Sequence, residues 1–109
     1  MHIGNDTGTM HVAAAVGCPV LTPNCFAEDI SRDHRDIIYS CSPYNVPSVV
    51  IRPEHALHEC KTAVPVDYWG CQANVPHCIT QIEPTTLFKG FKLLRERIAK
   101  KINEPLYIS

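Results

Sequence analysis

One stretch constrains the fold more than any other part of the chain: residues 5–21, NDTGTMHVAAAVGCPVL. Asp6 is a suitable N-cap for a helix, and Gly17 stands where a helix ends in the left-handed conformation. Between them a narrow face of small or apolar residues recurs with helical spacing, namely Met10, Ala13, Ala14 and Gly17. The pattern predicts a helix over 7–16 that packs closely on a sheet, followed by a buried strand over 19–22.

The start of this helix is suited to binding an anion. The first turn of a helix leaves amide groups unpaired at the positive end of the helix dipole. Gly8 has no Cβ, so a phosphate group can approach the backbone closely. Thr7 offers a hydroxyl and His11 a ring nitrogen, and helical spacing places both with Gly8 on one face. The other interpretation of the same residues is an ordinary capped crossover between two strands.

Residues 5–20 resemble the nucleotide-sugar-binding signature of glycosyltransferase family 9, the ADP-heptose:lipopolysaccharide heptosyltransferases and their relatives. The family pattern is Asn-Asp-(Ser/Thr)-Gly-x-Met-His-(Leu/Val)-Ala-Ala-Ala-x-Gly-x-Pro. A weaker similarity extends to clustered cysteines and to residues 78–84, CITQIEP, ahead of a terminal helix. The resemblance implies a two-domain GT-B fold, in which this motif lies late in the second, Rossmann-like domain.

The resemblance also implies what the site does. It implies that a nucleotide-sugar donor, such as ADP-heptose, is bound without metal or cofactor at five residues: Asp6, Thr7, Gly8, Thr9 and His11. Thr7, Gly8 and Thr9 would hold the diphosphate with His11 as a supporting donor, and Asp6 would cap the helix, fix the loop and bond a hydroxyl of the donor. The general base is implied to be a carboxylate of the first domain, so no catalytic residue is assigned to this chain. Three partners are implied: the nucleotide-sugar donor, the missing N-terminal half of the protein, and a lipid-linked saccharide acceptor that binds through the domain in that half.

The loop after the predicted 19–22 strand borders the donor site in many nucleotide-sugar enzymes. Asn24, Glu28 and Arg32 are therefore candidates for contacts with the sugar or the ribose. The alternative is that these polar side chains form an ordinary solvated surface.

The predicted fold class is α/β, with short parallel strands and crossover helices. Residues 46–52, rich in β-branched side chains, form the second clear strand. Only residues 1–4 precede the phosphate turn, and a crossover helix needs a sheet of several strands to pack on. We therefore expect the chain to be the last part of a larger protein. The resemblance implies that residues 1–109 are a partial Rossmann-like domain, the C-terminal half of the second domain of a GT-B protein, inactive on its own.

A long terminal helix is predicted from Pro84 to about residue 103. Its apolar stripe consists of Leu87, Phe88, Phe91, Leu94, Ile98 and Ile102. Gly90 lowers the helix propensity by up to about 1 kcal/mol, so packing must hold this helix. The opposite face is basic, and it either is simply solvated or docks on an anionic inner membrane.

Composition limits the remaining function classes. The net charge of −1 argues against nucleic-acid binding through phosphate neutralisation. No apolar run approaches the roughly 20 residues of a membrane span, and residues 1–6 do not resemble a signal peptide. The sequence predicts a cytoplasmic protein.

Two alternatives to the transferase remain, and the first of them depends on the six cysteines. Four residues could ligate zinc in a small Cys/His structural or metal-binding module: His58, Cys60, Cys71 and Cys78. The absence of a Cys-x2-Cys pair favours plain packing instead, a disulfide is a third option, and no metal ligand is assigned. The second alternative is a UDP-sugar 2-epimerase-like fragment, which shares a similar turn. The His-Val-Ala-Ala-Ala run over 11–15 favours the transferase.

Overall fold

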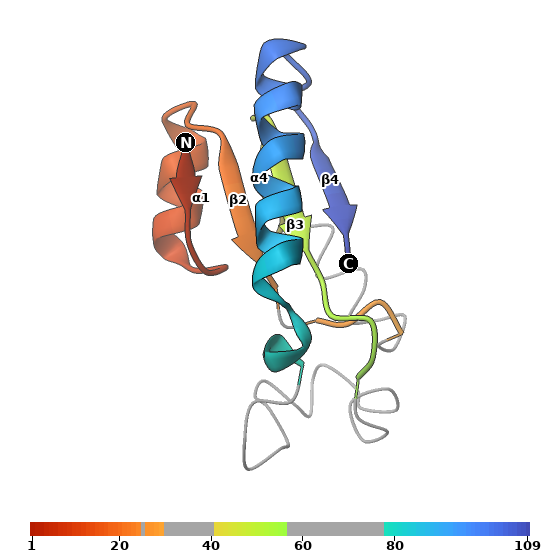
Figure 1. Cartoon of the computed structure of the whole chain (residues 1–109). Helices are drawn as coiled ribbons and strands as arrows, with labels where there is room; N and C mark the ends of the chain where they lie inside the picture. Colours follow the sequence, from red (N-terminus) through yellow and green to blue (C-terminus); the bar gives the residue numbers. More distant parts are fainter. Residues whose placement is uncertain (25, 30–40, 57–77) are drawn as a thin grey trace.

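The computed structural model describes residues 1–24, 26–29, 41–56 and 78–109. In these residues four parallel strands form one sheet in the order β1-β2-β3-β4 (Figure 1). The strands are β1 (His2–Ile3), β2 (Val20–Pro23), β3 (Ser48–Ile51) and β4 (Pro105–Ile108). Helix α1 (Gly8–Ala15) links β1 to β2, and the 3-10 helix η2 (Ile79–Gln81) and α4 (Pro84–Ala99) precede β4. The α/β class with parallel strands is confirmed.

Helices α1 and α4 cover opposite faces of the sheet. Successive side chains of a strand point to opposite faces, so neighbouring residues of β2 contact different helices. On β2, Val20 packs against Met10 and Ala14 of α1, whereas Leu21 packs on the side of Leu94 of α4. Figure 1 shows α4 crossing in front of the sheet.

Helix α1 ends as the sequence predicts. Gly17 adopts a φ of 84°, its amide donates to the Ala14 carbonyl at 3.0 Å, and the Cys18 amide donates to the Ala13 carbonyl at 2.9 Å. This is a Schellman motif, which satisfies two carbonyls of the last turn. The predicted 7–16 helix is thus confirmed to within one residue at each end, and the following strand begins one residue later than predicted.

Helix α4 begins at Pro84 as predicted but ends at Ala99, so the prediction of helix to about residue 103 is wrong. Lys101 adopts a φ of 54° and its amide donates to the Ile98 carbonyl at 3.1 Å, while the Ile102 amide donates to the Arg97 carbonyl at 3.0 Å. A second Schellman motif therefore stops the helix, with a lysine in the position usually held by glycine. The chain then forms β4, which the sequence analysis missed.

The packing of α4 explains its glycine. A Cβ placed on Gly90 would lie 2.9 Å from Leu21 Cδ1 and 3.0 Å from Ile51 Cδ1, so glycine permits a close approach of helix to sheet. Leu94 is fully buried beside these residues. The close approach at Gly90 and the burial of Leu94 are consistent with the prediction that packing holds this helix.

Phe88 departs from the predicted apolar stripe. Its side chain is 60% exposed, and its ring lies 6.4 Å from that of Phe91, with Lys92 Nζ 4.7 Å from its centroid. The stripe is therefore narrower than predicted, because the close approach at Gly90 leaves the Phe88 side of the helix outside the core. None of the helices in the described ranges is long and apolar enough to cross a membrane.

Candidate functional site

The predicted site lies at the carboxyl end of the sheet, where parallel α/β sheets commonly bind ligands. Strand β1 ends at Ile3, and the chain runs through a short loop into the first turn of α1. The five predicted site residues all lie in this loop and turn and are exposed, although the side chain of Asp6 is only 28% exposed: Asp6, Thr7, Gly8, Thr9 and His11. At the end of the neighbouring strand β2 stands Asn24, which contacts the same loop.

The first-turn amides of α1 are open. Thr7 is the N-cap, with φ −141° and ψ 178°, and it makes no side-chain capping bond. Its carbonyl accepts from the amides of Met10 at 3.1 Å and His11 at 3.4 Å. Among the residues that the structure describes, the amides of Gly8 and Thr9 donate to no protein group. A Cβ on Gly8 would meet no atom of the described residues within 4 Å, so these residues leave the space beside Gly8 open.

Two threonine hydroxyls flank the open amides. Thr7 Oγ1 and Thr9 Oγ1 lie 2.9 Å apart and share one hydrogen bond, and both side chains are exposed. One hydroxyl proton therefore remains to be donated outward. The first turn thus presents two backbone donors and one hydroxyl donor together.

Asp6 does not cap the helix, so that prediction is wrong. Its Oδ2 instead accepts a hydrogen bond from Asn24 Nδ2 at 2.8 Å, and its Oδ1 lies 3.8 Å from His11 Nε2. Burial raises the pKa of the Asp6 carboxyl, and the charge of His11 partly opposes this. The fold therefore brings Asp6 and His11 together beside the first turn of α1, and the Asp6 carboxylate does not bond the amides of that turn.

The side chain of Asn24, a predicted sugar or ribose contact, is used within the fold. It is only 5% exposed, its Nδ2 is used by Asp6, and its Oδ1 accepts from the Phe26 amide at 2.7 Å. Of the other two candidates in this loop, Glu28 is exposed and Arg32 lies outside the described residues.

A buried arginine supports the same loop, and the sequence analysis missed it. Arg52, at the end of β3, is 5% exposed, and its guanidinium donates to the carbonyls of Phe26 at 3.2 Å and Ala27 at 2.9 Å. Its amide donates to the Ile108 carbonyl at 2.8 Å. The only sequence signal was a charged residue closing a β-branched strand, which does not distinguish a buried side chain from an exposed one.

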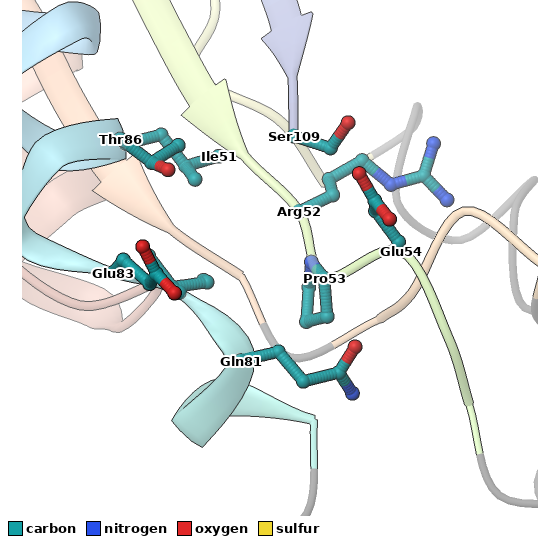
Figure 2. Close-up of a pocket in the computed structure, with 9 residues that line it drawn as sticks. Ile51, Arg52, Pro53, Glu54, Gln81, Glu83, Thr86 and Ser109 are labelled. Atoms are coloured by element: carbon teal, nitrogen blue, oxygen red, sulfur yellow. The ribbon is translucent and has the colours of Figure 1, made fainter.

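A cavity of about 260 Å³ opens where β3 ends, beside the start of α4 (Figure 2). Its lining residues are Ile51, Arg52, Pro53, Glu54, Gln81, Ile82, Glu83, Thr86 and Ser109. It includes no residue of the 6–11 turn. This cavity and the candidate anion site are therefore separate.

The zinc hypothesis falls largely on residues that the structure does not describe. His58, Cys60 and Cys71 lie outside the described ranges, so the zinc and disulfide options stay predictions. Within those ranges no group of three or more His, Cys, Asp or Glu residues could hold a metal ion. Two described cysteines carry free thiols: Cys18 and Cys41.

Comparisons with protein-family models, with curated proteins and with solved structures found no match for this chain. The resemblance to glycosyltransferase family 9 therefore depends on the motif at residues 5–20 and its weaker continuation at 78–84.

Proposed function

We propose that this chain is the donor-binding part of a glycosyltransferase similar to family 9, and that it binds the diphosphate of a nucleotide sugar. One observation carries the proposal: the exposed amides of Gly8 and Thr9, without protein acceptors in the described ranges, at the carboxyl end of β1. A nucleoside diphosphate gains negative charge as the glycosidic bond breaks. Fixed donors at that position stabilise this charge without a metal ion.

The side chains around these amides have compatible roles. The hydroxyls of Thr7 and Thr9 donate to phosphate oxygens, and His11 adds a ring donor beside them. Asp6 lies next to the diphosphate and bonds a hydroxyl of the donor. The acceptor, a lipid-linked saccharide, and the general base that activates it belong to a separate N-terminal domain, so the chain alone does not catalyse hexosyl or heptosyl transfer.

The exposed apolar surface supports the view that this is part of a larger Rossmann-like domain of GT-B type. Ile3 on the edge strand β1 is 56% exposed, and Val12 and Val16 on α1 are 65% and 77% exposed. Parallel sheets are usually covered on both faces and flanked by further strands. The rest of this Rossmann-like domain would extend the sheet beyond β1. The whole enzyme would work in the cytoplasm at the surface of the inner membrane, where its acceptor lies.

Calorimetric titration of the chain with ADP tests the proposal, with Gly8→Val as the blocking variant. Because a Cβ at Gly8 meets no neighbour, valine is accommodated in the fold but obstructs a phosphate on the amides. Ala15→Val is the matched control, since it adds the same branched side chain at the exposed far end of α1. The proposal expects ADP binding by the wild type and the control and at least a tenfold loss in Gly8→Val, about the effect of losing charge-assisted bonds. Equal ADP affinity in the three proteins would refute it.

A further inference from the structure

Asp6 lies beside the open first turn of α1 but makes no bond to the amides of that turn. A carboxylate next to a helix N-terminus is attracted by the dipole and commonly accepts from the first-turn amides. Asp6 directly precedes the N-cap Thr7, yet no capping bond forms, and its Oδ2 bonds Asn24 at 2.8 Å instead. A neighbouring element therefore holds this carboxylate away from the helix.

Asn24 is fixed in an orientation that suits this task. The Phe26 amide is a donor, so it requires the oxygen of the Asn24 side chain, and their distance is 2.7 Å. Nδ2 then faces Asp6, whose carboxylate requires a donor. The Asn24 backbone is anchored as well, because its amide donates to the Ile51 carbonyl on β3 at 2.8 Å. Both ends of the side chain are thus assigned by their partners, at a position only 5% exposed.

We propose that Asn24 is a positioning residue that prevents Asp6 from capping α1, and so keeps the Gly8 and Thr9 amides open. Without the Asn24 bond, the Asp6 carboxylate would swing onto these amides and compete with any anion there. The part of this inference that concerns an anionic ligand rests on the proposed function. The part that concerns Asp6 and the helix does not.

The first test needs no ligand. Asn24→Asp retains an oxygen for the Phe26 amide but replaces the donor toward Asp6 with a like charge. Amide hydrogen exchange, followed by NMR, is expected to slow at Gly8 or Thr9 by about fivefold in this variant, the equivalent of one capping interaction. Adding Asp6→Ala should return the exchange rates to wild-type values. Unchanged exchange in a folded Asn24→Asp variant would overturn the proposal.

The second test uses inorganic pyrophosphate, which has no sugar hydroxyl for Asp6 to bond. Asn24→Asp should weaken pyrophosphate binding about fivefold, and the double variant with Asp6→Ala should recover that loss, because the competing carboxylate is gone. If Asn24 had only a structural role, pyrophosphate binding would be weakened in both Asn24→Asp and the double variant. If Asn24→Asp does not fold, Asn24→Ala takes its place: it removes the donor toward Asp6 without adding a charge, so it should also weaken pyrophosphate binding, and Asp6→Ala in the same chain should again restore it.

The outcomes separate the two proposals. If the wild type binds neither ADP nor pyrophosphate but exchange slows in Asn24→Asp, the donor-binding proposal fails and the positioning role of Asn24 stands. If the wild type binds pyrophosphate and Asp6→Ala abolishes binding, Asp6 is itself a ligand contact and the positioning proposal fails.

Discussion

Gly90 of α4 lies so close to Leu21 of β2 that a Cβ on the glycine would be 2.9 Å from the leucine Cδ1. A methyl group there must displace both Leu21 and Ile51, whose Cδ1 atoms meet it within 3.0 Å. Gly90→Ala should therefore lower the free energy of unfolding by about 1–3 kcal/mol, although alanine is the better helix former. Urea denaturation measures this loss. The control is Gly8→Ala, which meets no neighbour and should leave stability unchanged or slightly raised; a Gly90→Ala protein as stable as this control would contradict the packing described.

Lys101 ends α4 in the left-handed region, where a side chain carries a steric cost. Lys101→Gly should raise the free energy of unfolding by about 1 kcal/mol, because glycine removes that cost. Lys100→Gly is the matched control, since its φ is −86° and glycine there should only destabilise. Thermal unfolding of both variants checks the prediction, and a lower melting temperature for Lys101→Gly would show that the second Schellman motif is wrong.

These two positions show why some helix ends are predictable and others are not. Gly17 and Pro84 carry local signals, a left-handed glycine and a proline at the first helical position, and both predictions hold. Lys101 has no such signal, and Ile102 continues the apolar spacing, so the sequence pattern runs past the true end of α4. The four-residue strand β4 is stabilised by pairing with β3, a contact that periodicity does not reveal.

The candidate site also has one part that the sequence predicts and one part that it does not. The open amides at Gly8 and Thr9 follow from the local sequence, because a helix start next to glycine leaves them unpaired. The partner of Asp6 does not, because Asn24 is 18 residues away and reaches it only through the parallel pairing of β1 and β2. Capping by Asp6 was the reasonable local prediction, and a tertiary hydrogen bond replaced it.

Arg52 should be more important for stability than its position at the end of a strand suggests. Arg52→Met keeps a long apolar side chain but leaves the carbonyls of Phe26 and Ala27 without their donors. We expect the free energy of unfolding to fall by about 2–3 kcal/mol, measured by urea denaturation. Arg95→Met, on the exposed face of α4, should change it by no more than about 0.5 kcal/mol. Similar losses in the two variants would contradict the supporting role of Arg52.

The pH dependence of stability should report the burial of Asp6. Because desolvation raises the pKa of Asp6 in the folded protein above its ordinary value of 3.8, the folded state binds this proton more tightly than the unfolded state. The contribution of Asp6 is therefore most favourable below that ordinary value and is lost as the pH rises through the raised pKa. Asp6→Asn, whose side-chain oxygen still accepts from Asn24, should gain stability relative to the wild type as the pH rises from 3 to 7. Urea titrations across this range check the sign; a relative gain by the wild type would contradict it.

A residue-resolved NMR titration of the ¹⁵N-labelled chain with ADP will show whether the first-turn amides of α1 hold a diphosphate. The amide of Thr85 in the first turn of α4 is an internal control, because that helix start has the same dipole but carries Glu83 as its N-cap. A diphosphate bound at this helix start should give saturable shifts of the Gly8 and Thr9 amide signals and none at Thr85. Shifts absent from Gly8 and Thr9, or equal at Thr85, would contradict it.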